Sequence, residues 1–399
     1  MSGYVGDLSP KQEKALEQFR EQAGDLLGRD DSDHACLRWL RARNFDVQQA
    51  KNMLQKHNST RKQHNLDTIL KDYQPRPFIK KNLIGGCCGF DKNGGPIWVY
   101  PFADLNVKAL LRGASAADIL EHMTYRCELS IKLMEEQSKK LGRNIETHTV
   151  IFDFGGFSII QSLQPDALSL LSGFISLYEA NYPERVQEVI VINAPALFTV
   201  LFNLMKPLLT GRTLQKISIF GKDNWKEYLL ERIDDDQLPV HWGGTKTDEN
   251  EDPMCRSLIT VATPIMEEEY KGTGMSKAEE MTWITIDRRV VHEVPIEVAN
   301  SDHTLCWQFE TEQHDIGFSI VRRPVQDDGE HDEEQLHPWQ RVQSNVRAQE
   351  GSIICDKPGV YVLKFDNTYS SYRSKKLGYA VQVVAPATSE DEQIVSTDL

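Results

Sequence analysis

Hydrophobic and polar positions divide the chain into three stretches with different periods. In the first, apolar residues such as Leu16 and Phe19 recur at helical spacing, and Ser9, Asp33 and Asp46 are placed to cap short helices. In the second, apolar runs alternate with helical segments, which predicts a mainly parallel sheet. In the third, short alternating runs are separated by turn residues, which predicts an all-β sandwich.

The expected elements of the second and third stretches follow from these periods. Strands of the parallel sheet are predicted at Leu83–Phe90, Pro96–Tyr100, Thr147–Phe154, Val189–Asn193 and Lys216–Phe220. Helices are predicted at Ser115–Leu141, Leu168–Tyr178 and Trp225–Ile233. Strands of the sandwich are predicted at Trp283–Val291, Val294–Ala299, Thr304–Glu310, Ile316–Val321, Gly359–Phe365 and Tyr379–Val384.

The most apolar helical stretch runs from Ala196 to Leu209, directly after a β-branched run. Its only polar residues, Thr199, Asn203 and Lys206, share one stripe, so the remaining circumference must contact apolar material on more than one side. The stretch is shorter than the roughly 20 apolar residues that cross a bilayer. Pro195 suits the opening of the helix, and Pro207 should kink or end it.

Two interpretations of this stretch remain open. It is either an ordinary core helix or a lid whose inner face covers a hydrophobic ligand and whose outer face can lie on a membrane. The second interpretation makes a gate of the apolar side chains Phe198, Leu201, Phe202, Leu204, Met205 and Leu208.

Changes in composition predict the domain limits. We expect an N-terminal helical bundle at 1–73, an α/β domain at 74–248, a charged linker at 249–280, a β-sandwich at 281–386 and an acidic disordered tail at 387–399.

Charge and cysteine content narrow the functional classes. A net charge of −14 disfavours nucleic-acid partners, although seven cations against one acid between His34 and Gln63 could attract an anionic membrane or headgroup. The first ten residues lack the features of a secretion signal. Seven cysteines without a CxxC pair are typical of reduced thiols, so a cytoplasmic protein is expected.

The sequence contains none of the short catalytic or nucleotide-binding motifs that would indicate an enzyme. GxGxxG, GxxxxGK[ST], GxSxG and HExxH are all missing. The run from Gln326 to His337 holds six acids and two histidines, but it lacks calcium-loop spacing and favours a solvated loop. We therefore expect a binding protein without a metal, a cofactor or a catalysed reaction.

Three motifs, LRWLRARNFDVQQAKNML, NYPERVQEVIVINAPALFTVLFNLMKPLL and LPVHWGG, make the chain resemble the CRAL-TRIO lipid-transfer family from roughly Pro10 to Thr245. The segment PGVYVLKFDNTYSSYRSKKLGYAVQV resembles a GOLD β-sandwich. This two-part arrangement is similar to that of supernatant protein factor and tocopherol-associated proteins, and most similar to that of the retinal-binding proteins of invertebrate photoreceptors.

The resemblance implies a cavity for one lipid between a sheet and a mobile helix, with Ala196–Leu209 as the gate. In phosphoinositide-binding members, residues that match Arg43, Thr213 and Lys216 hold the headgroup, but Asn44 stands where those members have lysine. Phosphoinositide binding is therefore a weaker expectation than carriage of a less charged ligand.

The expected function is non-covalent carriage of a hydrophobic molecule, most specifically retinal, between membranes or membrane proteins. Tocopherol, squalene or phospholipid transfer remains an alternative, as does a lipid-gated regulator or adaptor that binds a protein through its sandwich. Isomerisation of the bound lipid is a lesser alternative. Transient, peripheral membrane contact is part of each carrier hypothesis.

Overall fold

The computed structural model describes residues 1–28, 30–265, 281–323, 333–346 and 348–386. It contains two compact units. The first comprises Met1–Phe157, Ser169–Pro195 and Leu208–Gly274, and the second comprises Ser158–Leu168, Ala196–Pro207 and Met275–Leu399. The predicted acidic tail lies outside the described residues, as does most of the acidic run that begins at Gln326.

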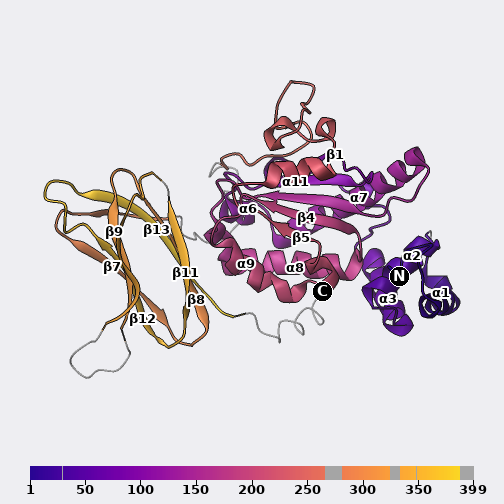
Figure 1. Cartoon of the computed structure of the whole chain (residues 1–399), viewed down its shortest axis with the longest axis horizontal. Coiled ribbons are helices and arrows are strands. Elements are labelled where there is room, and N and C mark those ends of the chain that lie inside the picture. Colours follow the sequence, from indigo (N-terminus) through magenta and orange to yellow (C-terminus); the bar gives the residue numbers. More distant parts are fainter. Residues whose placement is uncertain (29, 266–280, 324–332, 347, 387–399) are drawn as a thin grey trace. The chain divides into compact units, whose positions relative to one another are not determined.

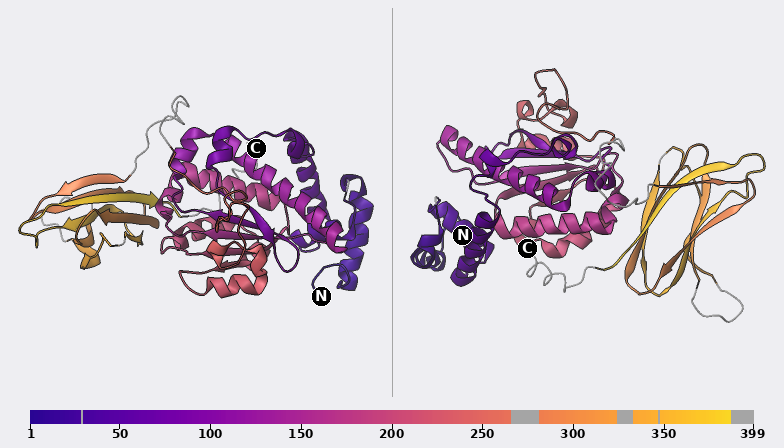
Figure 2. Two further views of the ribbon diagram at one scale, coloured as in Figure 1. Left: turned by 90° about the horizontal axis from the view of Figure 1, so that it is seen from above. Right: turned by 180° about the vertical axis from the view of Figure 1, so that it is seen from behind.

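The chain begins with three helices, α1 (Pro10–Ala23), α2 (Asp33–Ala42) and α3 (Val47–Gln63). They enclose a small apolar core and lie together at one end of the first unit (Figure 2). The predicted caps at Ser9 and Asp46 are confirmed. The predicted cap at Asp33 is wrong, because the preceding serine accepts the backbone hydrogen bond and Asp33 is the first helical residue.

The remaining helices lie between residues 69 and 232, and the sequence did not predict the four that have seven residues or fewer. They are α4 (Ile69–Asp72), α5 (Pro77–Asn82), α6 (Val107–Gly113), α7 (Ala116–Leu141), α8 (Pro165–Asn181), α9 (Phe198–Met205), α10 (Gly211–Leu214) and α11 (Trp225–Arg232). Five 3₁₀ turns are added, η1 (Gly24–Leu26), η2 (Ile159–Leu163), η3 (Lys206–Leu208), η4 (Asp235–Gln237) and η5 (Val240–Trp242), among the described residues.

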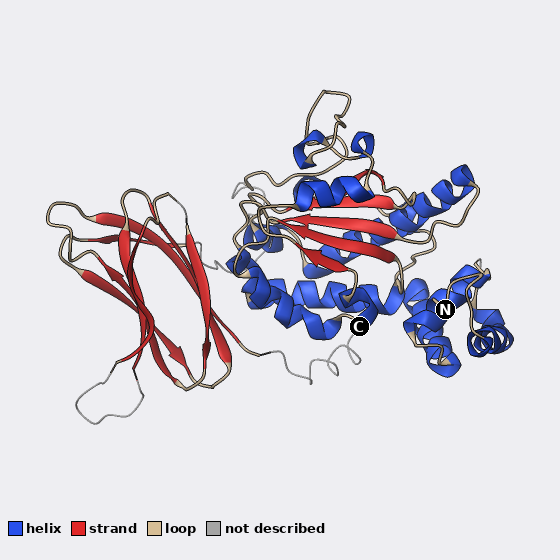
Figure 3. Cartoon of the chain, in the orientation of Figure 1, coloured by secondary structure: helices blue, strands red, loops and turns tan. Residues whose placement is uncertain are grey.

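The first unit is built on a five-stranded sheet in the order β1-β2-β3-β4-β5. Its strands are β1 (Gly86–Phe90), β2 (Pro96–Pro101), β3 (His148–Asp153), β4 (Val186–Ile192) and β5 (Ile217–Ile219). β1 and β2 form the predicted antiparallel hairpin, and the other neighbours are parallel. Helices cover the sheet on both sides (Figure 3). The predicted mainly parallel α/β fold is confirmed.

One face of this sheet is packed solid. Alternate residues of the central strands point to it, and Val99, Ile151 and Ile190 have no exposed surface. They pack against Trp225 and Leu229 of α11, which lies on the opposite side of the sheet from α8 (Figure 1). This cluster is the main hydrophobic core of the first unit.

Residues 249–260, which the sequence assigned to a linker, belong to that core instead. Cys255 and Ile259 are fully buried, and Thr260 forms a bridge with Gly85. A Cβ at Gly86 would lie 2.0 Å from the Leu258 carbonyl oxygen, so the close approach of the two backbones requires glycine there. The linker prediction is wrong for this part because its few apolar residues complete the core.

The C-terminal residues form two four-stranded antiparallel sheets with a shared apolar core, which confirms a β-sandwich (Figure 3). The sheet orders are β10-β9-β12-β7 and β11-β8-β13-β6. The strands are β6 (Thr282–Ile286), β7 (Val291–Val298), β8 (His303–Thr311), β9 (Ile316–Arg323), β10 (Glu334–Val342), β11 (Gln349–Cys355), β12 (Gly359–Asp366) and β13 (Lys375–Val384).

Two predictions for the sandwich are wrong. The expected strand Trp283–Val291 is two strands, because Arg289 adopts a left-handed φ of 64° in a turn between β6 and β7. β10 and β11 were not predicted as strands, since most side chains of β10 are exposed and give no alternating apolar signal.

Candidate functional site

The second face of the central sheet differs from the solid face beneath α11. Tyr100, Val150, Phe152 and Val189 point to it from neighbouring strands, and each remains partly exposed. Their neighbours one residue away in the same strands are fully buried on the other side. Trp98, His148 and Val191 alternate to the same face but are buried, so this face is accessible in part, whereas the face beneath α11 is packed.

Aromatic side chains continue this accessible face beyond the ends of the strands. The ring of Phe152 lies 5.4 Å from that of Tyr100 and 6.0 Å from that of Phe102. Phe102 in turn stacks on Phe154 at 4.5 Å. We define the accessible face by its partly exposed residues Tyr100, Phe102, Val150, Phe152 and Val189.

Helix α8 accompanies this face and is apolar around most of its circumference. Its apolar side chains are only partly buried, as is seen for Leu170, Leu171, Phe174, Ile175 and Leu177. An apolar helix of a water-soluble domain normally buries such residues on at least one side. Partial exposure all round indicates that α8 lacks a tightly packed neighbour along its inner side.

Two phenols, Tyr100 of this face and Tyr178 of α8, lie deep in the fold and remain partly accessible. Burial raises the pKa of Tyr100 to about 12 and raises the pKa of Tyr178 well above its ordinary value. Neither side chain is completely covered. Both phenols therefore combine a buried environment with some remaining accessible surface.

A chain of polar side chains connects the sheet with α7 and α8. Trp98 Nε1 lies 3.1 Å from Ser130 Oγ, which lies 2.9 Å from His148 Nδ1, and His148 Nε2 lies 3.1 Å from the Tyr178 hydroxyl. Burial, aided by the charges of Arg185 and Lys216, lowers the pKa of His148 to about 3. The imidazole is therefore neutral and carries one proton at physiological pH.

Only the first hydrogen bond of this chain has a direction fixed by its atoms, and the directions of the other two follow from the tautomer of His148. Ser130 Oγ accepts the indole N–H, and its own proton can go to His148 Nδ1. In the tautomer that has its proton on Nε2, the imidazole donates to the oxygen of Tyr178. This arrangement leaves the hydroxyl proton of Tyr178 available to a further acceptor.

The predicted gate helix is shorter than its apolar pattern. β4 ends at Ile192, Asn193 adopts a left-handed φ of 53° and donates to Asp153, and α9 begins only at Phe198. Pro195 therefore lies in the turn and does not open the helix, which corrects that prediction. The helix gives way to η3 at Lys206, directly before Pro207, as expected.

The side chains of the gate segment separate into two sides. Phe198, Leu201 and Met205 are buried, whereas Thr199, Asn203 and Lys206 of the polar stripe are exposed. The other predicted gate residues, Phe202, Leu204 and Leu208, are partly exposed. The amphipathic geometry agrees with the predicted stripe, while contact with a ligand stays a prediction.

The three predicted headgroup residues are not all brought together. Lys216 follows α10 and donates to the Thr213 carbonyl through its backbone N–H. Its ammonium group donates to the Val186 carbonyl at 2.7 Å and lies 3.5 Å from Glu184. Arg43 instead donates to the carbonyl of its neighbour Ala42. Thr213 and Lys216 are adjacent, but the recorded contacts of Arg43 are local.

Arg41, a cation of the N-terminal helices, reaches Glu184, which is also the partner of Lys216. Sequence reasoning did not select Arg41 for the site. Its side chain is 1% exposed and contacts Glu146 at 3.0 Å and Glu184 at 3.9 Å. The ring of Tyr4 covers its guanidinium group at 3.9 Å. The signal was the apolar setting of Arg41 within a buried helix, a setting that it shares with Arg38.

A pocket of about 470 Å³ opens between α3, α4, α5 and α7. Its lining is mainly polar and includes Asp72, Arg76, Asp118 and Glu121. Arg76 pairs with Asp118 at 2.6 Å across it. A lining of this kind is unsuited to a hydrophobic ligand, because apolar groups gain nothing from polar walls.

Within the described ranges, no cluster of histidine, cysteine and acidic side chains has the composition of a metal site. No helix in the described part of the chain combines the length and the hydropathy needed to cross a membrane.

Comparison with known families and proteins shows two matches to family descriptions. Residues 4–56 match the CRAL/TRIO N-terminal domain, and residues 80–244 match the CRAL/TRIO domain. A CRAL-TRIO domain-containing protein of Caenorhabditis elegans is 30% identical over 345 residues, which are 82% of this chain and 47% of that protein. Protein real-time of Aedes aegypti is 28% identical over 327 residues, which are 80% of this chain and 50% of that protein.

The chain thus spans about half the length of these two relatives. Among solved structures, the crystal structure of Sfh5 superposes with a TM-score of 0.50 at 14% sequence identity, over 66% of this chain and 96% of that chain. At this identity the likeness concerns the fold alone.

Proposed function

Because the chain contains a CRAL/TRIO domain over residues 80–244, preceded by its N-terminal domain, we propose that it binds one lipophilic molecule and transfers it between membranes. The ligand lies against the accessible face of the sheet, beside α8, and is carried without chemical conversion. Transfer takes place in the cytoplasm through transient contact with the membrane surface. The incomplete packing of this face is the observation on which the proposal depends.

The energetics of burial explain why such a carrier is needed. A molecule the size of retinal exposes on the order of 400 Å² of mostly apolar surface, and burial is worth roughly 10 kcal/mol at about 25 cal/mol per Å². The same free energy opposes escape of the free lipid from a membrane into water. A protein that offers an apolar surface at the membrane lowers this barrier.

The polar chain that ends at Tyr178 favours a ligand with an oxygen at one end. The available hydroxyl proton of Tyr178 can be donated to a carbonyl or hydroxyl oxygen of the ligand. Retinal, the ligand expected from the sequence motifs, satisfies this condition, and so does tocopherol. Squalene has no oxygen and gains nothing from this group. We also propose that the β-sandwich is a GOLD domain.

Binding of retinal would be non-covalent. A Schiff base requires a lysine that is deprotonated in an apolar site, and Lys206 of the gate segment is exposed. Borohydride treatment of the loaded protein should therefore leave no retinyl adduct.

The gate provides the test of transfer. Phe202→Asp places a charge on the partly exposed apolar side of α9, where it opposes contact with a bilayer or a ligand. We expect transfer of fluorescent retinoid or tocopherol between vesicles to fall at least tenfold. Asn203→Asp adds the same charge to the exposed stripe and should leave the rate within twofold of wild type.

Lipid extracted from the purified protein and identified by mass spectrometry provides the second readout. An oxygen-bearing lipophile at close to one molecule per chain supports the proposal. A protein that retains no lipid and catalyses no transfer, or equal transfer by both α9 variants, would contradict it.

A further inference from the structure

Four loops meet at one end of the β-sandwich. They connect β6 with β7 (287–290), β8 with β9 (312–315), β10 with β11 (343–348) and β12 with β13 (367–374). The register brings them together, since Lys375 pairs with Ile286, and Asp366 pairs with both Val291 and Gly317. We call this part of the sandwich the loop end; the side chain of residue 347 is not included.

Three apolar side chains project from three different loops of the loop end. Val290 is 43% exposed, Val346 is 78% exposed and Tyr372 is 90% exposed. Exposed valines and tyrosines scattered singly need no explanation. Their position on separate loops at the same end of the domain is a different pattern, because one flat partner can contact all three.

Exposed arginines flank these apolar residues. Arg288 and Arg289 precede Val290, and Arg373 follows Tyr372. The cations nearer the strands are paired, Arg341 with Asp315 at 2.6 Å and Lys376 with Glu312. Asp315 and Glu312 are taken up by these strand cations, and Asp287 is the remaining exposed acid of the described loop residues. Three exposed arginines against one exposed acid leave the loop end cationic, in a chain whose net charge is −14.

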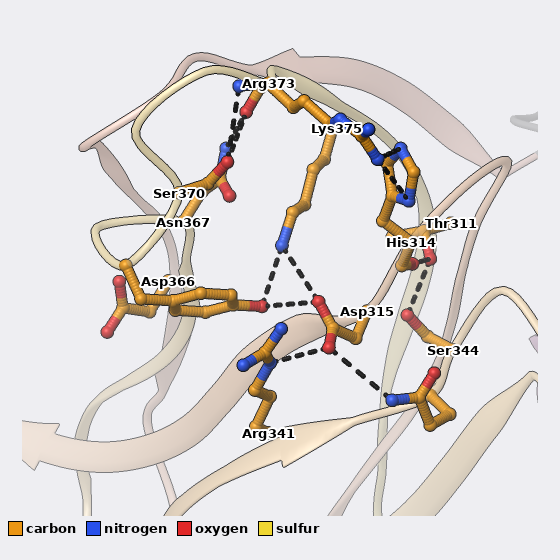
Figure 4. A network of polar contacts seen from close by, with 12 residues as sticks. Thr311, His314, Asp315, Arg341, Ser344, Asp366, Asn367, Ser370, Arg373 and Lys375 are labelled. Carbon is orange, nitrogen blue, oxygen red and sulfur yellow. Dashed lines mark hydrogen bonds and ion pairs between the residues drawn. The ribbon is translucent and has the colours of Figure 1, made fainter.

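Buried polar contacts hold the longest of these loops, residues 367–374, in place (Figure 4). The amide of Asn367, which has no exposed surface, lies 3.0 Å from the Arg373 carbonyl and 3.1 Å from the Asp287 carbonyl. Lys375 Nζ lies 3.2 Å from Asp315 and 2.7 Å from the Tyr369 hydroxyl. Loops fixed in this way lose little conformational entropy when they bind.

We propose that the loop end docks on an anionic lipid surface. Valine and tyrosine side chains enter the headgroup region, where amphipathic and apolar groups are favoured. The arginines gain from the negative surface potential, at roughly fivefold in affinity for each cation near the surface. The net charge of the whole chain is negative and adds no attraction to this surface, so the attraction must come from local groups of cations such as the loop end.

This inference is independent of the proposed carrier function. It predicts that the ligand-free and ligand-loaded protein bind vesicles alike, and that binding depends on headgroup charge. The partner is a lipid surface and not a protein, because the apolar contacts are small, separated and surrounded by cations, whereas stable protein interfaces have a contiguous apolar centre.

The test measures co-sedimentation of the full chain with vesicles of phosphatidylcholine alone or with about one third phosphatidylserine. We expect binding only to the anionic vesicles, weakened at least tenfold by 0.5 M salt because charge attraction is screened. The variant R288E/R289E should lose at least 25-fold in affinity. The variant V346S/Y372S should lose at least fivefold, since it removes the apolar contacts.

Matched controls come from the opposite end of the sandwich. K357E reverses an exposed cation after β11, and I354S removes a side chain that is 71% exposed on that strand. Both should bind like wild type. Equal binding to neutral vesicles, or equal losses in the control variants, would overturn the proposal.

Circular dichroism verifies that each variant is folded. Lipid content after purification should be unchanged in R288E/R289E and V346S/Y372S, which separates failure of docking from failure of carriage. If these variants retain vesicle binding while the Phe202→Asp protein loses it, membrane contact belongs to α9 alone and the loop-end inference is wrong.

Discussion

The two faces of the central sheet are made by the same strands, yet they have different physical roles. On one, Ile151 and its neighbours are fully buried against α11. On the other, Phe152 and Tyr100 retain accessible surface beside α8. A tightly packed face stabilises the fold, whereas an incompletely packed face gains free energy when a ligand buries its exposed apolar surface. The comparison teaches that stability and binding can be assigned to residues adjacent in sequence.

The strongest challenge to this comparison is to truncate both neighbours. Ile151→Ala removes a fully buried side chain and should lower the free energy of unfolding by about 3 kcal/mol or more, through lost burial and the cavity left behind. Phe152→Ala removes a larger side chain but should cost only about 1 kcal/mol, since less contact is lost. Urea unfolding measures both.

Lipid content per folded molecule should change in the opposite order. It should fall at least fivefold in Phe152→Ala and stay near wild type in Ile151→Ala. If Phe152→Ala were the more destabilising of the two, the accessible face would be part of the packed core and the comparison would fail.

Acid provides a second, smaller test, because the polar chain next to the accessible face contains a buried neutral histidine. Burial lowers the pKa of His148 to about 3, compared with about 6.5 for an unfolded chain. The unfolded state therefore binds a proton that the folded state excludes. The neutral His148 therefore contributes to the free energy of unfolding, and this contribution is complete above pH 6.5. It is lost as the pH falls towards 3, and the loss is about 1.4 kcal/mol at pH 5.5.

Burial likewise lowers the pKa of His122 on α7, to about 4. In the sandwich, hydrogen bonds from Arg341, Tyr369 and Lys375 lower the pKa of Asp315, whose contribution is lost only below its ordinary pKa of 3.8. We expect the first unit to lose stability between pH 6.5 and 4, before the sandwich does. The variant His148→Gln should flatten the pH dependence of unfolding, and an unchanged slope would contradict this account.

The smallest expected effect on stability distinguishes structure from ligand recognition. Tyr178→Phe removes the hydroxyl that forms a hydrogen bond with His148 Nε2 and should cost about 1 kcal/mol. Its effect on the ligand should be selective, with retention of retinal or tocopherol reduced about tenfold and that of squalene unchanged. Competition between the lipids, read by mass spectrometry, measures this ratio.

Equal losses for squalene and for the oxygen-bearing lipids would show that Tyr178 contributes shape alone. Ser172→Ala, on a partly exposed position of α8, is a control that alters a hydroxyl on the same helix away from the histidine.

The sequence predicted the elements of the α/β unit well, because β-branched runs and capping residues act locally. The run before Asn193 is a strand, and Ser9 and Asp46 cap their helices as expected. The exposed strand β10 was missed because its contacts are made by the backbone, which leaves little trace in side-chain polarity.

The candidate site was less predictable than the fold. Ile151 and Phe152 are equally apolar, and only the packing of distant helices decides which of them is fully covered. Similarly, Arg41 and Arg43 look alike in sequence, but helix α2 turns only Arg41 towards Glu184. The turn at Asn193 depends on its contact with Asp153, which lies 40 residues earlier in the chain.

The tail of the α/β unit, where Gly86 lies against the backbone of Leu258, has a practical consequence for dissecting the protein. Charge alone would suggest a boundary at residue 248. A fragment that stops there lacks the buried Cys255 and Ile259, so apolar core surface beside β1 becomes exposed. Fragments that extend through Thr260 retain these two buried side chains and are suited to crystallisation or spectroscopy.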